Sequence, residues 1–168
     1  MSLSLVLSLV LALSPLGLAG PAQQKDKPVP QKDKPAAAGG VRTIDITGGD
    51  DMKYSVTTIP AKRGETLRIR LVSKGTLPKA AMAHNVVVLK AGASQIKFAN
   101  AAGMAAATGY IPAEKDLKDQ IIAATGMAGP GETVEATFKV PDAAGKYPYI
   151  CTFPGHFAAG MRGVLEVK

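Results

Sequence analysis

The chain has 168 residues, and 20 lysines and arginines against 13 aspartates and glutamates give it a formal net charge of +7. This length allows one domain with short appendages, and the abundance of glycine and proline favours turns over long helices. The positive excess favours acidic partners or anionic surfaces, but no nucleic-acid-binding motif accompanies it, so nucleic acid is not an expected partner. The single cysteine excludes an internal disulfide.

The N-terminal 22 residues predict a secretory signal peptide. Residues 1–20 carry no charge, and the apolar run over 3–18 has the length of a signal sequence and is short for a spanning helix. The small residues Gly20 and Ala22 predict cleavage after Ala22. We therefore expect an exported protein, periplasmic or otherwise extracytoplasmic, which contacts a membrane only if this segment is retained.

Residues 23–40 predict a disordered linker rich in lysine and proline. The unit Gln-Lys-Asp-Lys-Pro occurs twice, at 24–28 and 31–35, and this segment has too little apolar surface to form a core. It is either a spacer that separates the domain from a membrane or a partner, or a disordered leader without a function of its own. The folded domain is expected over 41–168.

Most of the predicted domain consists of short strands. Over 65–73 the apolar Leu67, Ile69 and Leu71 alternate with polar residues, the period of a half-buried strand. Residues 84–90 form a continuous apolar run, which predicts a central strand buried on both faces. Further strands are expected over 42–48, 54–59 (the weakest), 132–140, 147–153 and 163–168.

These seven strands, separated by glycine and proline turns, predict an all-β sandwich. Residues 91–127 interrupt the pattern. We expect this region to form an inserted flap with one short helix, since residues 113–124 have a helical composition and 101–109 have no clear period.

The segment CTFPGHFAAGM (151–161) predicts a metal site. It contains Cys151, His156 and Met161 in one turn between the last two strands, and His84 begins the central strand. Taken singly, each of these residues would also fit an ordinary core or surface position without a metal. Together, two imidazoles, a thiolate and a distant thioether suit copper of the electron-transfer type, whereas methionine is a poor zinc ligand.

The segments MAHNVVVL (82–89) and CTFPGHFAAGM resemble the two copper-binding segments of azurin-like cupredoxins, the blue copper group of azurin and the auracyanins. The resemblance implies a Greek-key β-sandwich with one type 1 copper ion at one end. The ligands would be His84, Cys151 and His156 in the equatorial plane, with Met161 axial. It further implies that Asn85 ties the ligand loop to the strand carrying His84. Azurins have glycine at the position of Ala83. The resemblance therefore does not decide whether the backbone carbonyl of Ala83 contacts copper.

The resemblance also implies a route for electrons through His156, whose ring edge is expected to reach the surface. Uncharged, small or apolar residues surround it, and we call this set the docking patch: Met82, Phe153, Pro154, Gly155, Phe157, Ala158 and Ala159. Such a patch suits transient contacts with redox proteins. The expected function is a monomeric electron carrier, with copper delivery or storage as the alternative. A copper enzyme would need a second metal site and more histidines than the two present.

Overall fold

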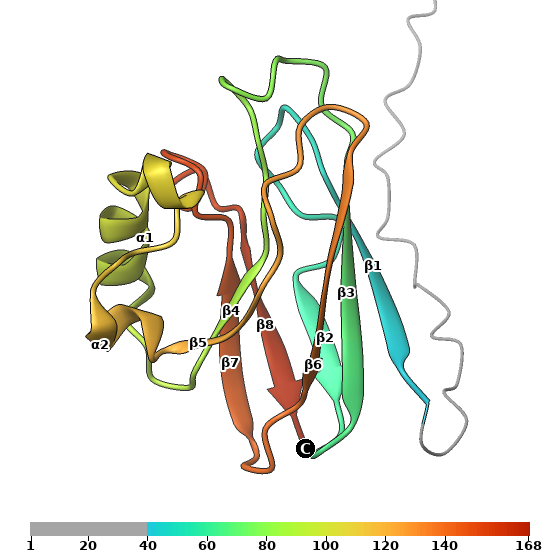
Figure 1. The fold of residues 1–168 in the computed structure, drawn as a ribbon. Coiled ribbons are helices and arrows are strands. Elements are labelled where there is room, and N and C mark those ends of the chain that lie inside the picture. Colours follow the sequence, from blue (N-terminus) through green and yellow to red (C-terminus); the bar gives the residue numbers. More distant parts are fainter. Residues whose placement is uncertain (1–39) are drawn as a thin grey trace, which may run out of the picture. The chain divides into compact units, whose positions relative to one another are not determined.

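The computed structural model describes residues 40–168, so the predicted signal peptide and all but the last residue of the predicted linker lie outside the described residues. Within this range two sheets pack face to face (Figure 1). The strands are β1 (Arg42–Gly48), β2 (Thr58–Ala61), β3 (Thr66–Ser73), β4 (Val87–Leu89), β5 (Ile121–Ala124), β6 (Thr133–Lys139), β7 (Gly145–Ile150) and β8 (Arg162–Val167). The helices are α1 (Gln95–Gly103), the single 3₁₀ turn Ala106–Thr108 and α2 (Lys115–Lys118).

The two sheets have the orders β1-β3-β6 and β2-β8-β7-β4-β5. The pairs β1 with β3 and β2 with β8 are parallel, whereas the other pairs are antiparallel. The chain crosses from one sheet to the other between β1 and β2, β2 and β3, β3 and β4, β5 and β6, and β6 and β7. The predicted all-β Greek-key sandwich is therefore confirmed.

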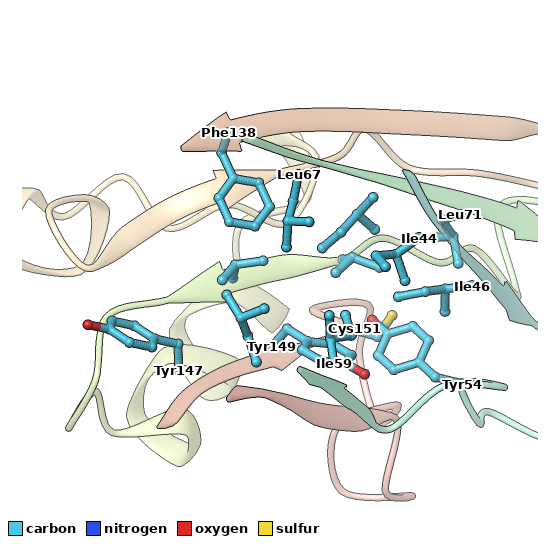
Figure 2. Close-up of a cluster of buried hydrophobic side chains, with 14 of the residues drawn as sticks. Ile44, Ile46, Tyr54, Ile59, Leu67, Leu71, Phe138, Tyr147, Tyr149 and Cys151 are labelled. Carbon is cyan, nitrogen blue, oxygen red and sulfur yellow. The ribbon is translucent and has the colours of Figure 1, made fainter. Parts of the chain in front are cut away.

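Alternating side chains build the core between the sheets. In β3, Leu67, Ile69 and Leu71 are buried, while Arg68 and Arg70 point outward and form ion pairs with acidic residues of the neighbouring strands. Figure 2 shows Leu67 and Leu71 facing side chains of the opposite sheet that include Ile59 and Tyr149. The predicted alternation over 65–73 is confirmed, and burial of this apolar surface is the main stabilising contribution to the fold.

The flap between β4 and β6 contains more regular structure than expected. Helix α1, absent from our prediction, begins after Ser94, whose side chain accepts a hydrogen bond from the backbone N–H of Lys97. Its buried Phe98 packs in a second apolar cluster with Leu89 of β4 and Ile150 of β7. The flap helices therefore lie against the outer face of the five-stranded sheet (Figure 1).

The predicted helix over 113–124 is wrong in its second half. Only Lys115–Lys118 is α-helical, and Ile121–Ala124 is strand β5, which pairs antiparallel with β4. The reason is tertiary, because pairing with the edge of β4 outweighs the helical composition of a short segment.

Three predicted strands also differ in their bounds by more than one residue, and the one expected over 147–153 is β7, which ends at Ile150. Of the strand predicted over 84–90, only β4 (Val87–Leu89) forms. His84 lies before it and makes an isolated bridge with Ala128. The weak strand expected over 54–59 begins later, at Thr58. Among the described residues no helix is long and apolar enough to span a membrane.

Gly163 of β8 provides a test of the packing between strands. A Cβ at this position would lie 2.2 Å from Tyr149 Cζ and 2.7 Å from the backbone oxygen of Thr57. We expect Gly163→Ala to lower the free energy of unfolding by about 1–3 kcal/mol, since the backbone must shift to relieve the overlap. Gly103→Ala is the matched control, because a Cβ at that position would have no neighbouring atom within 4 Å. Urea unfolding of both metal-free variants measures the difference, and equal stability of the two variants would contradict it.

Candidate metal centre

Three potential metal ligands converge at one end of the sandwich. The ring nitrogens Nδ1 of His84 and His156 are 3.2 Å apart, and Cys151 Sγ is 3.5 Å from His156 Nδ1. One donor atom from each of the three residues lies within 4.8 Å of the others. All three residues are buried, with 0% exposure for His84 and Cys151 and 2% for His156. Two segments far apart in the sequence thus bring their donors to one point.

Backbone hydrogen bonds fix each ligand segment. His84 exchanges two bonds with Ala128, of 2.9 and 2.8 Å, which anchor it although it lies outside β4. Cys151 directly follows β7, and its N–H donates to the carbonyl of Met161. Within the turn, the N–H of Met161 donates in turn to the carbonyl of His156 at 2.9 Å. The ligand loop is therefore closed on itself by its own backbone.

Met161 lies in the core beside this cluster. Its side chain is fully buried, and a Cβ built on Gly48 would lie 2.6 Å from Met161 Cε and 3.4 Å from the His84 ring. The thioether side chain and the His84 imidazole therefore meet at the end of β1, where only glycine leaves room for both. Gly48 was not among the predicted site residues, and no pattern in the sequence distinguishes it from the other glycines.

Asn85 connects the segment of His84 to the segment of Cys151 through hydrogen bonds with Thr152. Its Nδ2 donates to Thr152 Oγ1 at 2.8 Å, and the N–H of Thr152 donates to Asn85 Oδ1 at 2.9 Å. Both residues are buried, so the pair is shielded from competing water. Thr152 was not predicted from the sequence, although it directly follows Cys151 and this position could have indicated its role. Ala83, the other neighbour of His84, is buried at 2% exposure.

Burial sets the protonation states of the three donors. It lowers the pKa of His84, and it lowers the pKa of His156 to about 4, with a further contribution from the charge that His84 carries when protonated. Both imidazoles are therefore neutral at pH 7, which is the form that binds metals. Burial raises the pKa of the Cys151 thiol to about 11, so the metal-free thiol holds its proton at pH 7.

The arrangement of these donors fits a copper ion. Metal–nitrogen and metal–sulfur bonds of about 2.0–2.3 Å place the donors of a trigonal site about 3.5 Å apart, close to the two separations observed. Two Nδ1 atoms face each other in this buried site, and His84 Nε2 has no hydrogen-bond partner among the described residues. Two imidazoles, one thiol and a neighbouring thioether form the ligand set that selects copper over zinc.

Comparison with known proteins agrees with this site. The family of copper binding proteins of the plastocyanin/azurin type matches residues 41–168. The chain belongs to this family. It is 37% identical over 135 residues to auracyanin-A of Chloroflexus aurantiacus, covering 79% of this chain and 78% of that protein. It is 36% identical over 131 residues to an azurin of Pseudomonas denitrificans, covering 75% and 98%.

A solved structure with a similar fold is auracyanin A of Chloroflexus aurantiacus, described as a "blue" copper protein. It superposes with a TM-score of 0.65 at 36% identity, over 77% of this chain and 100% of that one. The comparisons therefore agree with the sandwich and with copper as the cofactor, and the resemblance inferred from the two motifs is confirmed.

The docking patch is less exposed than the sequence suggested. Phe153 is buried at 9% exposure, with its ring packed 5.1 Å from Tyr110 of the flap and 4.8 Å from the His156 ring. Pro154, Gly155 and Ala158 are exposed, and the remaining members, Met82, Phe157 and Ala159, are half-buried. The expectation that the His156 ring edge reaches the surface is not met, because this ring is almost fully covered.

The thiol of Cys151 leads to a prediction about metal binding. At pH 7 we expect Cu(II) binding to the metal-free protein to release one proton, because the ligand is the thiolate and both imidazoles are already neutral. The apparent affinity should then rise about tenfold per pH unit from pH 7, where both imidazoles are neutral, up to the thiol pKa of about 11. Calorimetric titration in buffers of different ionisation enthalpy measures the proton count. A count of zero, or of two, contradicts the assigned protonation states.

Proposed function

We propose that this chain is a type 1 blue copper protein that carries single electrons between redox proteins. His84, Cys151 and His156 would hold the copper ion, with the Met161 thioether beside them as a further, weaker donor. When bound, copper supplies one-electron chemistry by alternating between Cu(I) and Cu(II). The observation that carries the proposal is the convergence of three buried donors at one end of a rigid sandwich.

The residues around the donors contribute rigidity. The Asn85–Thr152 pair and the backbone bonds that close the ligand loop hold the donors in one arrangement. A site that keeps its geometry needs little rearrangement when its charge changes by one unit, which favours fast electron exchange. The buried surroundings also keep water away from the donors.

The burial of the ligands supports a carrier over a delivery or storage protein. Handing copper to another protein requires at least one ligand that an acceptor can reach, whereas His84, Cys151 and His156 are at most 2% exposed. The chain has two histidines and one cysteine in all, and each of them lies in this cluster. No second set of these residues remains for an additional catalytic copper site, so we propose a carrier and not an enzyme.

The remaining parts of the chain give the proposal its cellular setting. Residues 1–22 act as a signal peptide, 23–40 as a linker and 41–168 as the cupredoxin domain. The protein is then exported to a periplasmic or other extracytoplasmic space and works there as a monomer. Retention of the N-terminal segment would instead tether the domain to the membrane.

We propose that redox partners dock on the exposed part of the docking patch. Pro154, Gly155 and Ala158 are exposed, carry no charge and belong to the same turn as His156. An uncharged surface loses little hydration energy on contact, so a partner approaches closely and leaves quickly. The covered His156 ring belongs to the same turn, and we propose that it connects the donors to a docked protein.

The copper-loaded protein should show an intense visible band from thiolate-to-Cu(II) charge transfer. We expect Cys151→Ser to abolish this band, because a serine hydroxyl does not replace the thiolate donor. Met161→Leu is the control, since it leaves all three equatorial donors in place and should retain the band. Visible absorption at known copper content makes the comparison. A colourless wild-type protein that binds one copper ion would falsify the assignment.

The docking role of the loop is tested by adding a charge to it. We expect Ala158→Glu to slow electron self-exchange about tenfold, because each complex would then bury an uncompensated charge. Ala144→Glu is the matched control, since Ala144 is also exposed but lies beside β7 at the opposite end of the strand from Cys151. Line broadening in mixtures of oxidised and reduced protein measures the rate, and equal slowing in both variants argues against docking at the loop.

A further inference from the structure

An aromatic residue of the flap contacts the ligand loop. Tyr110 follows the 3₁₀ turn Ala106–Thr108 and is half-buried. Its ring centroid lies 5.1 Å from that of Phe153, and the Phe153 ring centroid lies 4.8 Å from that of the ligand His156. Figure 1 shows the flap beside the loop that joins β7 and β8. Three rings in contact thus connect the flap to one of the three donors.

The backbone of Tyr110 has a conformation that few residues with a side chain adopt. Its φ is 61°, in the left-handed region, where a Cβ atom crowds the neighbouring backbone. The preceding Gly109 has a φ of 65°, so two successive residues reverse the chain, and the N–H of Tyr110 donates to the carbonyl of Ala105 at 2.9 Å. Such strain persists only where surrounding contacts compensate for it. The contacts of Tyr110 are those of its ring with Phe153 and the main core.

The ring of Tyr110, and not its hydroxyl, makes these contacts. No hydrogen bond joins the Tyr110 hydroxyl to another described residue, whereas the hydroxyls of Tyr54, Tyr147 and Tyr149 each donate to a backbone carbonyl. The next residue, Ile111, packs against the second apolar cluster instead. Of these two neighbours in the flap, only Tyr110 therefore packs against the core that contains the ligands.

We propose that Tyr110 is a positioning residue of the metal centre, which holds the His156 imidazole through Phe153 and closes the ligand loop against water. His156 belongs to the same turn as the exposed Pro154 and Gly155, but its own exposure is only 2%. Tilted rings at these centroid separations attract one another, so Tyr110 keeps Phe153 on the imidazole. The inference rests on the proposed function and makes the flap, which supplies no ligand, a part of its site.

The single cysteine reports whether the ligand loop is closed in the metal-free full chain. Cys151 is fully buried, so dithiobis-nitrobenzoate reaches its thiol only when the loop opens. We expect Tyr110→Ala to accelerate thiol modification at constant pH by about tenfold, because Phe153 can then leave the imidazole. Tyr110→Phe should keep the wild-type rate, because it keeps the ring. An unchanged rate in Tyr110→Ala, or equal acceleration in Tyr110→Phe, overturns the proposal.

A neighbouring residue of the flap provides a matched control. Ile111 is also half-buried, and Ile111→Ala weakens the packing of the flap on the second apolar cluster without removing a ring from the stack. We expect its thiol to react at a rate close to that of the wild type. Equal acceleration in Ile111→Ala and Tyr110→Ala would mean that any loosening of the flap opens the loop, and this result would overturn the specific role of Tyr110.

Tyr110→Gly separates loop closure from the stability of the fold. Glycine adopts a φ of 61° without strain, so this variant should unfold at higher urea concentration than Tyr110→Ala. Its thiol should nevertheless react at least as fast as in Tyr110→Ala, because neither variant has the ring. A Tyr110→Gly thiol as protected as that of the wild type overturns the proposal.

The copper-loaded full chain provides a second readout. We expect a strong chelator to remove copper faster from Tyr110→Ala and Tyr110→Gly than from the wild type, Tyr110→Phe or Ile111→Ala, because water and chelator reach His156 once the rings separate. Equal rates in all five proteins contradict the role of Tyr110. Absence of the visible band from the wild-type protein would instead overturn the proposed function, and the thiol measurements on the metal-free chain would still test the closure of the loop.

Discussion

The paired hydrogen bonds between Asn85 and Thr152 are the constraint on which the metal centre depends. They join the segment that carries His84 to the one that carries Cys151 and His156, and these segments belong to distant parts of the chain. Both partners are buried, so a broken pair would leave polar groups unsatisfied in the core. Separating the two segments would therefore cost free energy, and this cost keeps their metal-binding donors together.

Burial of the Asn85–Thr152 pair and its surroundings also affects the chemistry of every donor. The same exclusion of water that strengthens the Asn85–Thr152 bonds keeps both imidazoles neutral and the Cys151 thiol protonated. The site is thus ready for a metal that displaces a single proton, and its ligands stay out of reach of other proteins. Tyr54 belongs to this environment, because its buried hydroxyl donates a hydrogen bond to the backbone carbonyl of Asn85.

Local patterns predicted most of the sandwich and the presence of the flap, but not the structure inside the flap. The alternation in β3 and the apolar run that contains β4 are properties of a few consecutive residues, and the structure agrees with them. Residues 121–124 have a helical composition but pair with the edge of β4, because a neighbouring strand supplies hydrogen bonds that no short helix there replaces. Helix α1 has a weak apolar pattern, so its packing on Leu89 and Ile150 decides its structure.

The sequence by itself determined which residues offer copper-binding atoms, because the chain has only two histidines and one cysteine and two of these three lie in a single turn. It also determined the family, through two short motifs whose residue types are set by chemistry. Only the tertiary structure decided how closely the donors approach, how far His156 is covered, and that Gly48, Thr152 and Tyr54 surround them. These properties arise from contacts between residues far apart in the chain, and no local pattern in a sequence records such contacts.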